Sequence, residues 1–226
     1  MTKFIFSCEH GGFEIPALYL AYFSGKEDVL QSHRGWDKGA LEIAKYISRR
    51  AGSKLISNSI SRLLIECNRT LGHHDLFSEF SQKITKDTQN QLIEEYYLPY
   101  RNQLERIIEQ HLHHQHQVIH LSFHSFTPLL NGEIRKTEVG ILFDPDNKLE
   151  QAFADAWKKS INEKIDSWRV KFNYPYKGTD DGLTTYFRGK YKENYAGLEI
   201  EINTKLLDAY PLNQISNWVF PPLSYR

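Results

Sequence analysis

Two histidines stand where buried strands are expected to end. His10 follows the apolar run 4–6 and precedes two glycines, a pattern typical of a strand that runs into a tight turn. His124 closes the alternating run 117–125, which predicts a strand with one apolar face. In open α/β sheets ligands bind outside the carboxyl ends of the strands, and neutral imidazole is a common zinc ligand. We therefore expect the two histidines to share one zinc ion; a surface histidine in a glycine turn is the alternative for His10.

Carboxylates lie within reach of the same edge. Asp37 immediately precedes an amphipathic pattern that begins at Leu41, so it is either a helix cap or a metal ligand. Glu199 and Glu201 share one face of the predicted strand 196–203. Two like charges on one strand face are costly unless one carboxyl is protonated or meets a cation, although an exposed edge strand could carry both in water.

Arginines complete the set. Asn68 and Arg69 end the strand-like run 61–69, and Arg62 stands near its start. A guanidinium presents a rigid fork that matches a carboxylate, so these residues could bind an acidic substrate; ordinary surface arginines are the alternative. Histidine and carboxylate ligands, an arginine fork and a free glutamate are together the parts of a metal-assisted amide hydrolase.

The elements that position these residues alternate between strands and helices. Further strands are predicted at 54–57, 139–143 and 170–174, and helices at 17–23, 88–112 and 149–165, with a kink or first turn at Pro99. The stretches 71–82 and 126–136 are expected to be loops. This order implies an α/β sandwich with a mostly parallel sheet, and the absence of a linker predicts a single domain over residues 1–226.

Composition narrows the functional classes. Formal net charge is zero and the isoelectric point is about 7.2, so the basic footprint of a nucleic-acid-binding protein is absent. No stretch approaches the roughly 18 apolar residues of a membrane span. Cys8 and Cys67 lie in apolar runs, which predicts buried free thiols and fits a reducing cytoplasm. We expect a monomer or a small homo-oligomer whose partner is a small acidic molecule.

Five motifs in this order resemble the N-formylglutamate amidohydrolase family: Ser-Cys-Glu-His-Gly-Gly at 7–12, His33 with Asp-Lys-Gly-Ala at 37–40, Ser-Arg-Leu at 61–63 with Asn68-Arg69, His-Ser-Phe-Thr-Pro at 124–128, and Glu-Ile-Asn at 201–203. The resemblance extends from residue 4 to about 204. It implies a three-layer sandwich with a mixed, mostly parallel sheet, similar to the zinc exopeptidases of the phosphorylase/hydrolase-like fold. It also implies zinc and the hydrolysis of an N-acyl, above all an N-formyl, acidic amino acid.

Site residues carry over motif by motif. The resemblance implies His10 and His124 as metal ligands, Asn68-Arg69 as the pair that binds the substrate carboxylate, and Glu201 or Glu199 as the general base. Carboxypeptidase-like relatives place the third ligand three residues after the first histidine, where this chain has Phe13. Asp37, which matches the Asp-x-Gly-Ala pattern, is preferred, and Glu14 is the alternative.

The remaining choices concern the substrate. Arg62, Arg135 and Arg188 are expected to help the Asn68-Arg69 pair hold an acidic group. The same parts would also serve a zinc carboxypeptidase or a peptide amidase. A catalytically silent module that binds a small acid is the non-enzymatic alternative.

Overall fold

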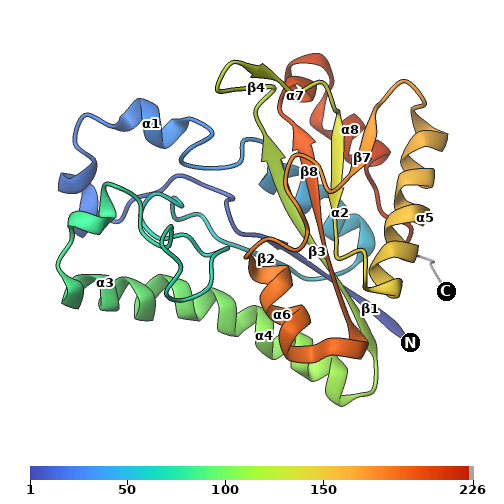
Figure 1. The fold of residues 1–226 in the computed structure, drawn as a ribbon, viewed down its shortest axis with the longest axis horizontal. Helices are drawn as coiled ribbons and strands as arrows, with labels where there is room; N and C mark the ends of the chain where they lie inside the picture. Colours follow the sequence, from blue (N-terminus) through green and yellow to red (C-terminus); the bar gives the residue numbers. More distant parts are fainter. Residues whose placement is uncertain (224–226) are drawn as a thin grey trace.

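A six-stranded mixed sheet forms the centre of the molecule, with strand order β2-β1-β3-β8-β6-β7 (Figure 1). The computed structural model describes residues 1–223. All neighbouring strands run parallel except β6 and β8, which are antiparallel. The strands are β1 (Thr2–Cys8), β2 (Leu55–Ser57), β3 (Gln117–Phe126), β6 (Val139–Leu142), β7 (Val170–Phe172) and β8 (Tyr195–Asn203).

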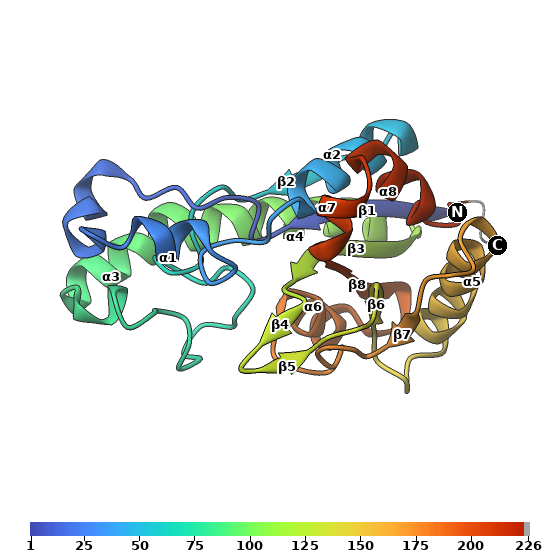
Figure 2. The ribbon, with the colours of Figure 1, turned by 90° about the horizontal axis from the view of Figure 1, so that it is seen from above.

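Helices cover both faces of the sheet, which confirms the expected three-layer α/β sandwich (Figure 2). One face packs against α2 (Ala40–Ala51), α5 (Lys148–Lys164), α7 (Lys205–Ala209) and α8 (Leu212–Trp218). The opposite face packs against α4 (Leu98–His113) and α6 (Leu183–Tyr191). Alternation along β3 divides its side chains between the two: Ile119, Leu121 and Phe123 enter the first core, and Val118 enters the second.

A smaller helical region extends beyond the carboxyl ends of the strands, at the left of Figures 1 and 2. It contains a 3₁₀ helix at Ala17–Phe23, α1 (Glu27–Gln31), a second 3₁₀ turn at Ser81–Lys83 and α3 (Lys86–Leu92). A π-helical stretch, Ile93–Tyr97, joins α3 to α4, and Pro99 lies in the first turn of α4. Proline lacks the N–H that would continue the helical ladder, and its place in the first turn of α4 matches the first-turn alternative predicted for Pro99.

Two predicted segments are folded differently. Residues 61–69 form turns instead of a strand, because the carbonyl of Ser61 accepts from Leu64 N at 2.9 Å and its Oγ accepts from Leu63 N at 3.3 Å. The predicted loop 126–136 contains a short hairpin of β4 (Leu129–Leu130) and β5 (Glu133–Ile134). This connection passes the end of β8, where Asn203 Nδ2 donates to the carbonyls of Arg135 and Thr137, both at 2.9 Å.

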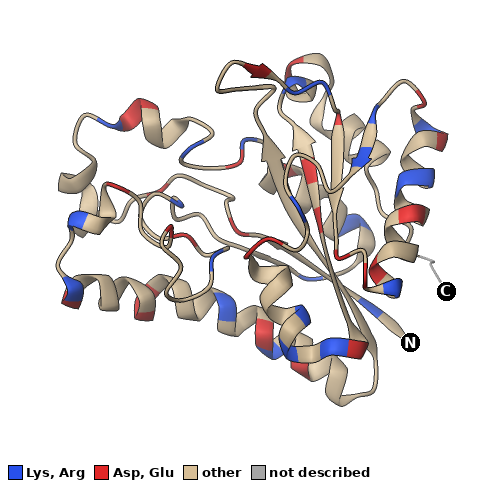
Figure 3. Cartoon of the chain, viewed as in Figure 1, with Lys and Arg blue, Asp and Glu red and all other residues tan. Residues whose placement is uncertain are grey.

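The distribution of charged side chains and the state of the two cysteines agree with what the composition predicts. Lys and Arg are interspersed with Asp and Glu over the helices (Figure 3). Cys8 and Cys67 are both buried and free, as predicted. Within residues 1–223 no helix has the length and apolar character needed to cross a membrane.

A buried ion pair joins α5, α6 and β8. Arg188 Nε and Nη2 donate to the two carboxylate oxygens of Glu150 at 2.9 and 3.0 Å, and Glu150 is fully buried. Arg188 also donates to the carbonyls of Gly178 and Gly197. Since its guanidinium is engaged on every side by the protein, the expected substrate contact of Arg188 is not retained, and we assign it a structural role.

Replacing Arg188 with Met should lower the free energy of unfolding by about 3–5 kcal/mol, because it leaves the Glu150 carboxylate buried without a cation. Urea unfolding of the wild type and the variant measures this difference. The double variant Arg188→Met/Glu150→Gln should recover part of the loss. A single variant within about 1 kcal/mol of the wild type would contradict the structural role.

Candidate active site

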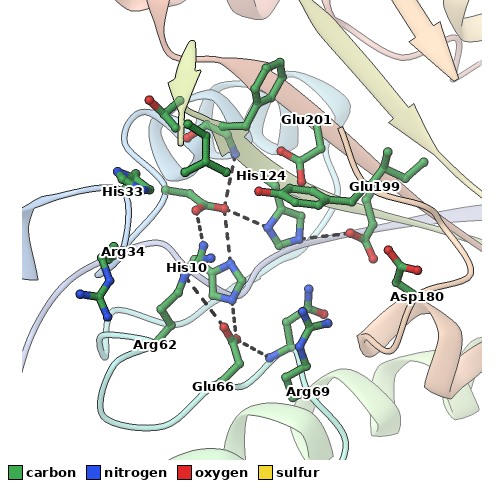
Figure 4. A pocket seen from close by; sticks show the side chains of 18 of the residues that line it. His10, His33, Arg34, Arg62, Glu66, Arg69, His124, Asp180, Glu199 and Glu201 are labelled. Carbon is green, nitrogen blue, oxygen red and sulfur yellow. Dashed lines mark hydrogen bonds and ion pairs between the residues drawn. The ribbon is translucent and has the colours of Figure 1, made fainter. Parts of the chain in front are cut away.

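The carboxyl ends of β1, β3 and β8 meet at one edge of the sheet and open into a cavity of about 340 Å³ (Figure 4). Parallel pairing sets His124 of β3 opposite Glu201 of β8, and His10 is the second residue after the end of β1. The lining includes the residues predicted from sequence, except Arg188 and the alternative ligand Glu14, and several others: His10, His33, Arg34, Asp37, Arg62, Glu66, Asn68, Arg69, His124, Arg135, Tyr176, Lys177, Asp180, Asp181, Glu199 and Glu201.

Two imidazoles converge on one carboxylate oxygen. Asp37 Oδ2 lies 3.3 Å from His10 Nδ1 and 3.0 Å from His124 Nδ1, and all three side chains are buried. Their candidate ligand atoms lie within 4.8 Å of one another. Two imidazole nitrogens and a carboxylate are the protein ligands of a catalytic zinc site. The donor set therefore fits a zinc ion.

Asp37 is the carboxylate of this set, and it is not a helix cap. Helix α2 begins at Ala40 after Gly39, and its N-cap makes no side-chain hydrogen bond. The backbone N–H of Asp37 donates to the carbonyl of His10 at 2.9 Å, which holds the two residues together. The alternative ligand, Glu14, is exposed and accepts from Ser59 Oγ at 2.7 Å.

A second interaction keeps Asp37 ionised. Burial disfavours its charge, but Arg62 donates to Oδ1 and outweighs that cost together with His10, so the pKa of Asp37 is held well below its usual value. Arg62 Nε also lies 4.0 Å from Glu66 Oε2. Arg62 therefore lines the cavity with one of its nitrogens already bound to the Asp37 carboxylate.

Sequence reasoning overlooked Glu66. Its Oε1 lies 2.5 Å from His10 Nε2 and accepts from the backbone N–H of Asn68 at 3.0 Å. Burial opposes the charge, but His10, Arg62 and this N–H outweigh it and lower the pKa of Glu66 to about 2. The available signal was a lone acidic residue inside the apolar stretch 63–67, which a strand assignment leaves without a role.

The two glutamates of β8 have different surroundings. Glu201 is only 4 % exposed, and its Oε2 is buried with no hydrogen-bond partner among residues 1–223. Burial raises the pKa of Glu201 to about 8. Glu199 Oε1 instead accepts from Thr184 Oγ1 at 2.7 Å, and its Oε2 lies 3.8 Å from His124 Nε2. Glu199 is thus on the side of the ring away from Nδ1. Since β8 lies between β3 and β6, the exposed-edge alternative is excluded.

The predicted substrate-binding residues that line the cavity differ in how far other protein groups already engage them. Asn68 Oδ1 accepts from Leu183 N at 2.7 Å, and Arg69 donates to the carbonyl of Asp181. The guanidinium of Arg135 lies 5.7 Å from the ring centroid of Tyr176 and has no carboxylate within ion-pair distance among the described residues. Of the arginines in the expected set, Arg62, Arg69 and Arg135 reach the cavity.

The profile of the N-formylglutamate amidohydrolase family matches residues 2–207. The chain belongs to this family. Membership confirms the resemblance drawn from the five motifs and supports an enzyme that hydrolyses an amide.

Two solved structures share this fold. The product of gene Atu2144 from Agrobacterium tumefaciens is 27 % identical with a TM-score of 0.81, covering 96 % of this chain and 87 % of its own. The N-formylglutamate amidohydrolase from Ralstonia eutropha JMP134 is 18 % identical with a TM-score of 0.71, covering 96 % and 91 %. The latter likeness shows the shared fold. Comparison with curated protein sequences finds no match.

In the metal-free protein, Glu201 should make stability fall as the pH rises. Its carboxyl holds a proton up to about pH 8 when folded, against the ordinary pKa of 4.5. Between these values the folded chain binds more protons than the unfolded chain, so the free energy of unfolding decreases with pH. Glu201→Gln remains neutral, so its stability relative to the wild type should grow by up to about 1.4 kcal/mol per pH unit in this window.

Urea unfolding of both proteins at pH 5 and pH 8, with a chelator present, measures the difference. Glu199→Gln is the matched control on the same strand face. Parallel pH dependence in wild type and Glu201→Gln would show that Glu201 titrates at an ordinary pKa.

Proposed function

We propose that the protein is a zinc-dependent amidohydrolase that releases an N-acyl group, above all formyl, from an acidic amino acid. One observation carries the proposal: a buried His-Asp-His set lies beside a buried carboxyl group that has an oxygen without a hydrogen-bond partner among residues 1–223, in a cavity lined by arginines. Family membership supports the amide as the bond that is cleaved.

His10, Asp37 and His124 would hold the zinc ion. When bound, zinc lowers the pKa of a water molecule and polarises a carbonyl. The donors have little freedom to move: Asp37 Oδ2 also accepts from the backbone N–H of Ser125 at 3.3 Å, and His10 Nε2 is fixed by Glu66. Pre-positioned ligands of this kind keep their geometry when substrate enters.

Glu201 is the general base of the proposed reaction. Its free Oε2 accepts a proton from the attacking water and returns it to the leaving amine. Efficient acid–base catalysis requires a pKa near the working pH, and burial moves Glu201 in that direction. Glu199 is the weaker candidate, because its carboxylate is already held by Thr184.

Arginine side chains orient the substrate. Arg69 donates from one nitrogen to the carbonyl of Asp181, and both Arg69 and its neighbour Asn68 line the cavity. Arg135 offers a second guanidinium without an ion-pair partner among residues 1–223, and Arg62 lies beside the proposed metal ligands. Holding the acidic end of the substrate would keep the scissile carbonyl near Glu201.

The purified protein should contain one zinc ion per chain and hydrolyse N-formylglutamate, and a chelator should abolish the activity. Glu201→Gln should keep zinc but lose roughly 10²–10⁴ in kcat, the usual contribution of a positioned base. Mass spectrometry of the metal and a formate-release assay provide the two measurements, with Glu199→Gln as matched control.

The outcomes separate the alternatives. Cleavage of a C-terminal residue or a peptide amide in preference to N-formylglutamate would assign the site to a carboxypeptidase or peptide amidase. Zinc without any hydrolysis would favour the silent binding module. Wild-type turnover by Glu201→Gln would remove Glu201 from the mechanism.

Arg69→Lys should be nearly as damaging as Arg69→Ala on N-formylglutamate, because an ammonium cannot reproduce the two-point contact of a guanidinium with a carboxylate. The loss should appear in kcat as well as in KM, since orientation is lost along with affinity. Steady-state kinetics with N-formylglutamate and its side-chain amide test this. Equal turnover of both substrates by the wild type would show that no carboxylate clamp exists.

A further inference from the structure

Glu9 is a fully buried carboxylate for which the proposed reaction has no use. It follows β1 and is 0 % exposed. Its Oε2 lies 3.1 Å from His124 Nε2 and accepts from Ser122 Oγ, while Oε1 accepts from Tyr100 OH at 2.7 Å. Within the described chain no Lys or Arg lies within ion-pair distance of it.

Such a group is expensive to bury. Taking a carboxylate out of water costs several kcal/mol, and hydrogen bonds offset this only in part. An apolar side chain of similar volume would avoid the cost and could still pack beneath α4. The carboxylate therefore points to a task that its charge performs on a neighbour, and His124 is the neighbour that reaches the cavity.

The hydrogen-bond directions define that task. An ionised carboxylate only accepts, so Glu9 requires the proton of His124 to be on Nε2. Ser122 Oγ donates its single hydrogen to Glu9 and so acts as an acceptor toward Nε2, 2.8 Å away. Both contacts favour the same tautomer. In the neutral ring the lone pair is then on Nδ1, the nitrogen that faces Asp37.

We propose that Glu9 is a positioning residue that fixes His124 as the Nε2–H tautomer and aims Nδ1 at the metal. The inference rests on the proposed function, because it assumes that zinc binds at this nitrogen. Carboxylates and other acceptors on the outer nitrogen of a metal-binding histidine set its tautomer and ring orientation, and their loss typically costs 10–100-fold in metal affinity. Glu9 is thus the buried counterpart, for His124, of Glu66 on His10.

The test compares zinc dissociation constants, measured by chelator competition, of wild type, Glu9→Gln and Glu9→Asp. Asp keeps the charge but withdraws its oxygens from Nε2, so both variants should bind zinc about 10–100-fold more weakly. In the zinc-loaded wild type, the Nε2–H proton of His124 should give a downfield NMR resonance that moves in both variants. Since Asp preserves the charge, it keeps the test available if Gln does not fold.

Tyr100→Phe is the matched control. It removes the hydrogen bond to the other oxygen of Glu9 and leaves the contact with His124 in place. A positioning role predicts zinc affinity within about twofold of wild type, well below the 10–100-fold loss expected at Glu9. If Glu9 merely joins β1 to α4, Tyr100→Phe should weaken zinc binding as much as Glu9→Gln.

The failure of each proposal is distinguishable. Wild-type zinc affinity and an unmoved Nε2–H resonance in both Glu9 variants would overturn this inference and leave the proposed function standing. A wild-type protein that binds no zinc would overturn both.

Discussion

The parallel pairing of β3 with β1 and β8 is the constraint on which the site depends. It places three carboxyl ends at one edge, and alternation sends Ser7, His120, Ser122 and Glu199 to one face of the sheet. That face is closed by α4 and α6, so the polar side chains are shielded from water and must satisfy one another. His120, for example, is held between Ser7 Oγ and Tyr195 OH, each at 2.7 Å, and burial lowers its pKa to about 4.

The polar layer gives the cavity floor its rigidity. Each candidate metal-binding histidine is held through its outer nitrogen by a separate carboxylate, and both inner nitrogens face Asp37. Because Arg62 occupies the other oxygen of Asp37, the carboxylate cannot rotate without losing a charged partner. These hydrogen bonds and ion pairs therefore hold the two histidines and Asp37 in place without a bound ligand.

Much of the fold could be predicted from hydrophobic periodicity. The alternation in 117–125 and 196–203 and the helical spacing in 149–165 correspond closely to β3, β8 and α5. The run 61–69 was misassigned because its apolar residues turn into a core instead of pairing with a strand. Tertiary packing overrides a local pattern in such segments.

The spacing of residues along the sequence could not predict which side chains pair with one another in the site and around it. Arg188 meets Glu150 across 38 residues, and only the packing of α5 and α6 against β8 from opposite faces of the sheet brings them together. Glu199 and Glu201 are equivalent in alternation, and the difference between them comes from Thr184 on α6. Glu9 and Glu66 lie outside the helices and strands, where no periodicity marks a side chain as buried.

The antiparallel strand β6 has a consequence for how such a cavity can change. Strand β6 starts near the edge of the sheet where β3 ends, so the chain connects the two strands without a crossover helix. The connection contains the β4–β5 hairpin, and beside the hairpin Asn203 Nδ2 donates to the carbonyl of Arg135. Surface connections of this type accept insertions and deletions far more readily than strands do. This connection, which carries Arg135, can therefore change in length and chemistry while the ends of β1, β3 and β8 keep their positions, so two different stretches of chain form the cavity lining.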